Sequence, residues 1–305
     1  MRKIYKKLLN KKLPAHSKDI SIAIIILLLL LCIGSFIFYK YLASQIRSDV
    51  TTITPLTSDN NNQLTKQTVK TVSSATFRIP ILMYHYVEYV QDKKDKIRQS
   101  LNITPYTFEQ QIKTLQNAGF TFMTAKELGD AIDGTTQLPK KPILLTFDDG
   151  HWDFDKVVLP ILKKYHIKAT VYIITGFIGK SDFMTQNQLQ DVVSSGLIDV
   201  GAHSIHHAML KGKFFPVVAY EVYQSKAMLE NTYHISVASF AYPDGVFDQQ
   251  AINIVKGSGF TTAVSTIPGI EQSNKNRFFL YRLRPGYKTG ETLLEYLRQN
   301  VFKAY

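Results

Sequence analysis

Short apolar runs alternate with amphipathic segments along the chain from residue 77 onward. Short, mainly apolar runs predict strands, and apolar residues that recur every three or four positions predict helices. The predicted strands span residues 78–87, 142–147, 169–174, 198–202, 236–241 and 261–265. The predicted helices run from a capping box at Thr107 to Gly119, from a second box at Thr124 to Gly134, and over residues 154–165, 185–195, 218–233, 249–257 and 291–299. This repeated strand-then-helix order predicts a parallel sheet, open or closed into a barrel.

Polar residues that can carry chemistry follow three of these strands directly. Asp148 and Asp149 come after the strand at 142–147, His203 comes after the strand at 198–202, and Tyr242 comes after the strand at 236–241. The C-terminal ends of parallel strands form the rim on which (β/α) barrels build their active sites. We therefore expect an α/β fold, a distorted (β/α) barrel, with these residues gathered on its rim.

The N-terminal part has a different pattern. Residues 20–39 are apolar and uncharged, which matches the roughly 20 residues that a helix needs to cross a bilayer, and seven Lys or Arg residues and one Asp precede them. This bias keeps the N-terminus in the cytoplasm. We predict a basic cytoplasmic stub at 1–19, one transmembrane anchor at 20–43, a flexible polar linker at 44–76 and an extracellular catalytic domain at 77–305. A cleaved signal peptide is the alternative, although its apolar region is usually shorter.

The formal net charge of +12 over 305 residues is largely a property of the N-terminal part. Residues 1–45 hold eight Lys or Arg and one Asp, which leaves +5 for the rest of the chain. No dense basic stripe follows, so nucleic-acid binding is not expected. The single cysteine, Cys32, lies inside the apolar run, so the exported part can form no intrachain disulfide and its stability must come from a packed core.

Asp149, His203 and His207 supply one carboxylate and two imidazoles, the ligand types of an open catalytic metal site. The i, i+4 spacing puts both histidines on one face if the segment after the strand turns helically. Asp148 is adjacent to a ligand, and two neighbouring acids at the end of a buried strand need a compensating cation. We therefore expect a divalent metal, with zinc as the favoured ion, and Asp148 as the general base on an activated water.

These residues stand in motifs that resemble the polysaccharide deacetylase family, also called carbohydrate esterase family 4 or the NodB homology group. TFDDG at residues 146–150 resembles its first motif, HSIHH at 203–207 its second, and SFAYP at 239–243 part of its third. The resemblance implies that Asp148 is the catalytic base, that Asp149, His203 and His207 bind the metal, and that the Tyr242 backbone N–H helps to form an oxyanion hole. The first predicted strand, RIPILMYHYV, is similar to the branch that carries FAYP.

The chain departs from the family pattern at two places. Ser239 occupies the position of the arginine that orients the base, and we hypothesise that Arg282, in LYRLRP, takes this role from a later strand. No histidine follows His234, so the family's late histidine, which protonates the leaving amine, has no counterpart. His85 either faces the site or is a core histidine.

The remaining polar and aromatic candidates are less specific. Trp152 is the only tryptophan, and we expect Trp152 and Pro243 to contact a sugar, although Trp152 would equally well cover the end of the barrel. His151 is expected to be a solvated polar residue near the rim, and His206 to point away from the metal.

The resemblance implies an enzyme that removes N-acetyl groups from N-acetylglucosamine units of an envelope polysaccharide, such as peptidoglycan or poly-N-acetylglucosamine. O-deacetylation of an acetylated polysaccharide is the first alternative, because an ester needs less acid assistance. A non-catalytic glycan-binding wall protein is the second alternative, and the intact aspartates and histidines argue against it.

Overall fold

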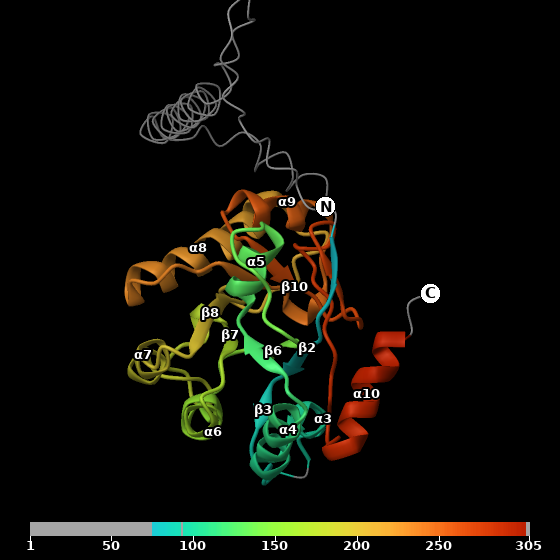
Figure 1. The fold of residues 1–305 in the computed structure, drawn as a ribbon. Coiled ribbons are helices and arrows are strands. Elements are labelled where there is room, and N and C mark those ends of the chain that lie inside the picture. Colours follow the sequence, from blue (N-terminus) through green and yellow to red (C-terminus); the bar gives the residue numbers. More distant parts are fainter. Residues whose placement is uncertain (1–74, 93, 303–305) are drawn as a thin grey trace, which may run out of the picture. The chain divides into compact units, whose positions relative to one another are not determined.

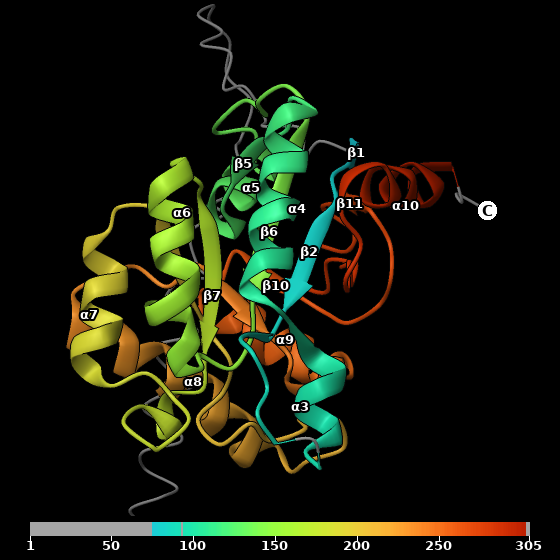
Figure 2. The same ribbon diagram turned by 90° about the horizontal axis from the view of Figure 1, so that it is seen from below.

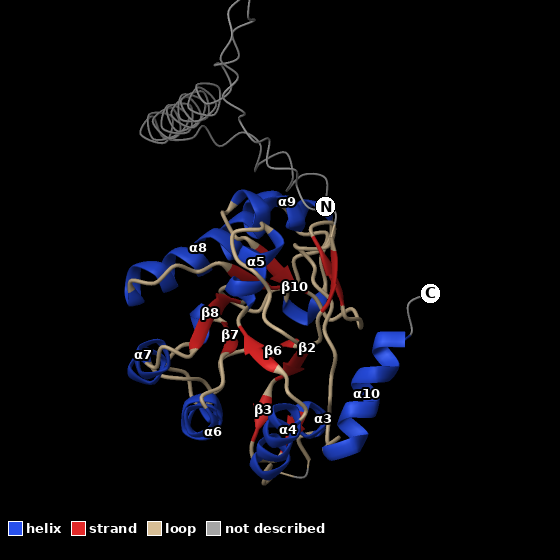
Figure 3. Ribbon diagram, viewed as in Figure 1, coloured by secondary structure: helices blue, strands red, loops and turns tan. Residues whose placement is uncertain are grey.

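The computed structural model describes residues 75–92 and 94–302. Seven parallel strands form its main sheet, in the order β10-β9-β8-β7-β6-β2, with β5 also paired to β6. Figure 1 shows this sheet among the helices, and Figure 3 separates the two kinds of element by colour. The strands are β2 (Ile81–Tyr84), β5 (Thr121–Met123), β6 (Pro142–Phe147), β7 (Ala169–Ile173), β8 (Ile198–Ala202), β9 (Ser239–Ala241) and β10 (Thr262–Val264).

The sheet curls, and one late segment hydrogen-bonds to both of its outer strands. Leu280 exchanges hydrogen bonds with the β10 side, where its N–H donates to Ala263 at 2.8 Å. Leu283 does the same with β2, where its N–H donates to Ile81 at 2.8 Å. Arg282 lies between these two contacts, so the segment that joins the two edges also carries a charged side chain into the interior.

Helices pack around this sheet, as Figure 2 shows for α4, α6 and α7. Helix α10 contacts α4, and α8 contacts both α9 and strand β8. Their buried apolar residues form a continuous core with the strands. The helices are α3 (Lys96–Leu101), α4 (Pro105–Asn117), α5 (Ala125–Ile132), α6 (Leu159–Tyr165), α7 (Gln186–Ser194), α8 (Phe215–Tyr233), α9 (Gln249–Gly257) and α10 (Gly290–Phe302).

The capping signals fix most helix starts. The boxes at Thr124 and Thr185 are confirmed, since each threonine accepts a hydrogen bond from the backbone three residues later. The predicted start at Thr107 is wrong. Thr104 is the N-cap of α4, because Pro105 suits the first helical position, where its missing N–H costs nothing.

Two predicted elements differ in detail. The strand predicted at 78–87 is divided into β1 (Thr76–Arg78), β2 and β3 (Tyr86–Val87), and Pro80, which cannot donate a ladder hydrogen bond, lies in the gap between β1 and β2. Strand β1 pairs antiparallel with β11 (Glu271–Ser273), and β3 pairs in parallel with β4 (Asn102–Ile103). The helix predicted at 154–165 begins with a π-helical turn, η1 (Phe154–Val158), before α6. Helix α3 and strand β5 were not predicted.

Among residues 75–92 and 94–302, no helix combines the length and apolarity that a membrane span requires. The predicted basic stub, the predicted anchor at 20–43 and residues 44–74 of the predicted linker lie outside the described residues.

Candidate active site

A sharp turn after β6 separates the two aspartates. The Asp148 N–H still donates to the Tyr84 carbonyl at 3.0 Å, as a strand residue would. Asp149 and Gly150 then take positive φ angles of 75° and 78°, which L side chains rarely adopt. A Cβ on Gly150 would lie 2.8 Å from the end of the Ile173 side chain, so a larger residue would be strained by its positive φ and would have to displace this side chain. The neighbouring carboxylates consequently face different partners.

Asp148 forms a buried, two-pronged ion pair with Arg282. Each Asp148 oxygen accepts a hydrogen bond of 2.7 Å from one terminal nitrogen of Arg282, and the exposed fractions of the two residues are only 4% and 1%. Arg282 also donates to the Ser265 carbonyl at 2.8 Å and to the Thr146 hydroxyl at 3.2 Å. Burial alone would raise the pKa of Asp148, but the Arg282 charge and hydrogen bonds outweigh it and hold that pKa below its usual value. Asp148 is therefore a buried carboxylate that stays ionised.

Asp149 meets His203 and His207 on the other side of the turn. Its Oδ1 lies 3.3 Å from Nε2 of His203 and 3.5 Å from Nε2 of His207. The three side chains are the only group in the described part of the chain that brings three candidate ligand atoms together, all within 4.8 Å of one another. The structure thus assembles the predicted ligand set.

The hydrogen bonds around this cluster test whether it fits a cation. Oδ1 of Asp149 is buried and accepts no hydrogen bond, although it faces two imidazole nitrogens. The Nδ1–H of His203 donates to the Ala241 carbonyl at 2.7 Å, which turns the lone pair of Nε2 toward Asp149. Lone pairs at this distance repel unless a positive charge lies between them. A divalent metal therefore fits this arrangement.

The electrostatics of the cluster agree with this reading. Burial alone would lower the pKa of His203, but Asp149 and Asp148 outweigh it and raise that pKa, so the two aspartates favour positive charge at this cluster, which a proton on the imidazole or a bound cation can supply. Burial lowers the pKa of His207, which keeps this imidazole neutral and able to donate a lone pair.

The loop between the two histidines is not helical, so the condition under which the i, i+4 spacing would place both on one helix face is not met. Ser204 and His207 have positive φ angles of 60° and 55° instead. The loop is tied to the turn that follows β7, where the N–H groups of Thr175 and Gly176 donate to the Ser204 and Ile205 carbonyls at 3.2 and 2.9 Å. Left-handed residues, and not the 3.6-residue period, bring the two imidazoles together.

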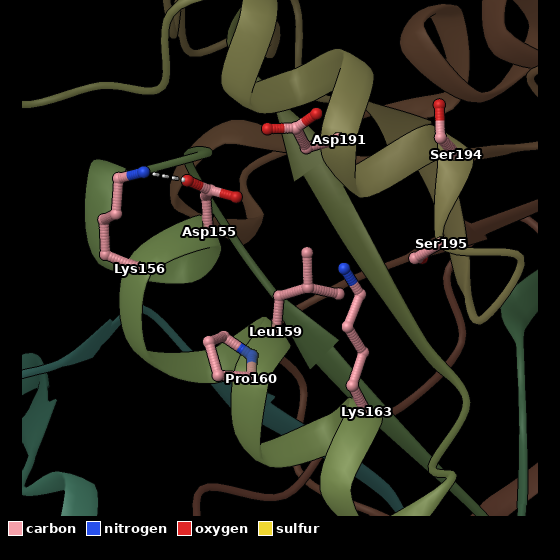
Figure 4. Close-up of a pocket in the computed structure, with 8 residues that line it drawn as sticks. All are labelled: Asp155, Lys156, Leu159, Pro160, Lys163, Asp191, Ser194 and Ser195. Atoms are coloured by element: carbon pink, nitrogen blue, oxygen red, sulfur yellow. Dashed lines mark ion pairs between the residues drawn. The ribbon is translucent and has the colours of Figure 1, made fainter.

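A cavity of about 310 Å³ contains both halves of the site. Asp148, Asp149, His203 and His207 lie in its lining, and Tyr86, Ile97 and Leu101 give it an apolar wall. Two charged residues, Asp244 and Arg284, also line it. A larger hollow of about 430 Å³ lies elsewhere, between η1, α6 and α7 (Figure 4), and contains none of the predicted site residues. The lining residues, and not the volume of the cavity, therefore identify the candidate site.

The other predicted site residues are placed less favourably. Tyr242 lines the cavity, but its backbone N–H donates to the Val264 carbonyl at a long 3.3 Å, so the oxyanion role stays a prediction. Neither Trp152 nor Pro243 lines the cavity. Their predicted contact with substrate has no support from the cavity's lining.

The three remaining histidines near the site have different surroundings. His85 lines the cavity, and its Nε2 lies 3.9 Å from Asp148. The prediction that His151 is solvated is wrong: it is buried between the rings of Tyr86 and Phe183, with Nε2 3.3 Å from Oδ2 of Asp149. His206 is not part of the cluster of Asp149, His203 and His207, and its Nδ1 contacts Glu221 instead.

Sequence reasoning missed several residues around the cavity. His151 follows TFDDG directly, and this adjacency was the available signal for its contact with Asp149. Arg284 stands two residues after Arg282, and alternate residues of an extended segment share a face. Nothing in the sequence pattern indicated that Glu221 or the wall from α3 would lie near the site.

Comparisons with known proteins agree with this geometry. The family model for polysaccharide deacetylase matches residues 135–263. A poly-β-1,6-N-acetyl-D-glucosamine N-deacetylase from Staphylococcus epidermidis is 28% identical over 244 residues, covering 73% of this chain and 82% of that protein.

Solved structures extend the likeness to the fold. The Streptococcus pyogenes deacetylase PplD, solved in complex with acetate, is 30% identical with a TM-score of 0.67, covering 72% of this chain and 98% of that one. A Bacillus cereus polysaccharide deacetylase is 26% identical with a TM-score of 0.63, covering 73% of this chain and 69% of that one. The resemblance found in the sequence is thereby confirmed, and the chain belongs to the polysaccharide deacetylase family.

Proposed function

We propose that this enzyme uses a divalent metal, zinc in our proposal, to remove N-acetyl groups from N-acetylglucosamine units of an extracellular or cell-wall polysaccharide. One observation carries the proposal: a single cavity holds both the ion-paired Asp148 and an Asp149 oxygen that accepts no hydrogen bond although it faces His203 and His207. The Staphylococcus epidermidis relative is named for the same bond in poly-β-1,6-N-acetyl-D-glucosamine, which supports the substrate class.

In this proposal Asp149, His203 and His207 hold the metal. A divalent cation there supplies positive charge that polarises the acetamide carbonyl and makes a nearby water more acidic. Asp148 takes the proton of that water as it attacks the carbonyl carbon. Arg282 fixes both oxygens of Asp148 and keeps it ionised, which holds the base ready at neutral pH.

The leaving nitrogen needs a proton when the carbon–nitrogen bond breaks. We propose that His85 delivers it, because this titratable residue lines the cavity and its Nε2 lies 3.9 Å from Asp148. Burial lowers the pKa of His85 despite the neighbouring aspartates, so the resting imidazole is neutral. We propose that His85 receives the water's proton from Asp148 and passes it to the nitrogen, so that acetate and a free amine are released.

Tyr242 is proposed to stabilise the oxyanion through its backbone N–H. That N–H now makes a 3.3 Å bond, at the long end of the normal range, with which a negatively charged substrate oxygen can compete. Ala241, the preceding residue, is fixed by His203, so the donor and the metal cluster share one support.

We further propose that the catalytic domain faces the outside of the cell and is held to the cell membrane by the predicted helix at 20–43. The uncharged run and the basic residues before it support this arrangement. Resistance of the full chain to alkaline extraction from membranes tests it, and release into the soluble fraction would contradict it.

The central experiment measures acetate released by the full chain in detergent, after metal removal and Zn²⁺ reconstitution. Poly-N-acetylglucosamine, purified peptidoglycan and O-acetylated xylan serve as parallel substrates, with Asp148→Asn as the control. We expect zinc-dependent acetate release from one of the two N-acetylated polymers and little from the Asn variant. Release from xylan alone would establish the O-deacetylase alternative, and equal release by both proteins would overturn the mechanism.

A further inference from the structure

Glu221 is a buried acid that lies outside the catalytic cavity. It belongs to α8 and is 5% exposed, and it is absent from the cavity lining. Acidic side chains are seldom buried to this extent unless they have partners. All of the partners that the structure shows for Glu221 come from the loop between the two histidine ligands.

Its carboxylate binds three donors from this loop. Oε2 accepts the backbone N–H groups of Ile205 and His206 at 2.9 and 3.0 Å. Oε1 lies 2.8 Å from Nδ1 of His206. Helix α8 thereby holds the middle of the HSIHH segment through one side chain.

This loop needs restraint because its backbone is strained. Ser204 and His207 occupy the left-handed region, which is unfavourable for residues other than glycine. On the opposite side the Gly176 N–H donates to the Ile205 carbonyl, and a Cβ on Gly176 would come within 2.6 Å of that oxygen. The loop is therefore clamped between the turn after β7 and Glu221, with His203 before the clamp and His207 after it.

We infer that Glu221 is a positioning residue for the metal site: it fixes the loop so that His203 and His207 both face Asp149. The inference rests on the proposed function, since it assumes that this cluster binds a metal. Without Glu221 the two N–H groups lose their acceptor, and the loop can relax toward ordinary φ angles that separate the imidazoles. Loss of such supporting contacts around a metal typically weakens binding 10- to 100-fold.

Helix α8 offers a matched control. Glu230 lies on the same helix and also accepts a backbone N–H, from Val237 at 3.0 Å, while pairing with Lys226 at 3.0 Å. Its contact supports the segment that leads into β9 and not the histidine loop. Leucine at either position removes one helix carboxylate that accepts backbone N–H groups, but only position 221 touches the loop.

The test is the dissociation constant for Zn²⁺, measured by competition with a chromophoric chelator, together with the thermal midpoint of the metal-free chain. Full-length wild type, Glu221→Leu, Glu230→Leu and Asp149→Ala are compared in detergent. We expect both leucine variants to lower the midpoint. We expect Glu221→Leu to raise the dissociation constant for Zn²⁺ by roughly 10- to 100-fold. Glu230→Leu should leave it at the wild-type value.

Three outcomes are informative. Wild-type Zn²⁺ affinity in Glu221→Leu, or an equal loss in Glu230→Leu, would overturn the inference. If Glu221→Leu does not fold, Glu221→Gln decides: its neutral amide should weaken Zn²⁺ binding by a smaller factor, and unchanged affinity would again overturn it. If Asp149→Ala binds Zn²⁺ as wild type does, the proposed function fails instead, because the cluster is then not the metal site.

Discussion

The two halves of the cavity contain adjacent aspartates, Asp148 and Asp149, whose negative charges are balanced in different ways. Asp148 has both oxygens bound by Arg282, whereas Asp149 leaves Oδ1 without a hydrogen-bond donor. The first half is neutralised by the chain itself, and the second needs a cation from outside. Identical carboxyl groups thus have different surroundings, which fits the proposed roles of Asp148 as the base and Asp149 as a metal ligand.

The backbone makes this difference possible. If residues 148 and 149 continued β6, their side chains would point to opposite faces of the sheet. The positive φ of Asp149 instead turns the chain so that both carboxylates line one cavity with different partners. The comparison leads to five predictions, ordered from the largest expected effect to the smallest.

Removing the Asp149 carboxylate should eliminate metal binding and activity together. Asp149→Ala deletes the ligand atom that faces both histidines, and the two imidazoles alone make a weak site. Isothermal titration with Zn²⁺ and acetate release measure the two losses. Activity that survives in this variant after chelator treatment would contradict the proposal that Asp149 binds a metal needed for catalysis.

Breaking the buried ion pair should destabilise the other half. Arg282→Ala leaves Asp148 buried without its partner, a change that costs roughly 3–5 kcal/mol of unfolding free energy. Arg282→Lys keeps the charge but not the two-pronged geometry, so we expect a smaller loss. Urea denaturation measures both, and an unfolding free energy equal to wild type in Arg282→Ala would contradict the role of the pair.

The same variants should shift the pH dependence. Arg282 lowers the pKa of Asp148, so the ionised base persists as the pH falls through the usual carboxylate range. The stability that this lowered pKa contributes is present above the unfolded-state value of about 3.9 and disappears as the pH falls through the folded-state pKa. In Arg282→Ala the acid limb of kcat/KM should therefore move to higher pH. A limb that stays in place would mean that Asp148 is not the base.

His85 should matter for turnover but not for metal binding. His85→Gln removes the proposed proton carrier beside Asp148, and general acid–base groups contribute typically 10²- to 10⁴-fold to rate. We expect kcat to decrease by a factor in this range, while the dissociation constant for Zn²⁺ stays at the wild-type value. A normal kcat would require another acid for the leaving amine.

The turn itself gives the smallest effect. Gly150→Ala forces an L side chain into the left-handed region and against Ile173, which should cost roughly 1–2 kcal/mol of unfolding free energy. Gly119→Ala is the matched control, since its φ is 77° but its Cβ would meet nothing within 4 Å. If thermal unfolding shows equal losses, the contact with Ile173 contributes nothing.

Local signals in the sequence predicted much of the fold. The strand at β6 and the helix at α9 end where the pattern predicts, and the boxes at Thr124 and Thr185 begin their helices. Each depends on neighbours within a few residues. Strand β5 and helix α3 are too short for a periodic pattern to indicate them.

The site was predictable where residue types determine chemistry, and not where distant parts of the chain meet. The residue types and motifs predicted the metal ligands and an arginine beside Asp148. They gave no distance between Asp148 and Arg282, which lie 134 residues apart. They also gave no indication that His151 would be buried between two rings or that Glu221 would reach the histidine loop, since both contacts arise only when separate elements pack.

The most direct test of the division between the two aspartates is Asp148→Asn, examined by Zn²⁺ titration and acetate release on the same preparation. Asparagine keeps the size of the side chain, while its neutral amide cannot take the proton from water. We predict a Zn²⁺ dissociation constant equal to that of wild type and a kcat lowered by roughly 10²- to 10⁴-fold. Lost Zn²⁺ binding, or a kcat that is unchanged, would contradict the account.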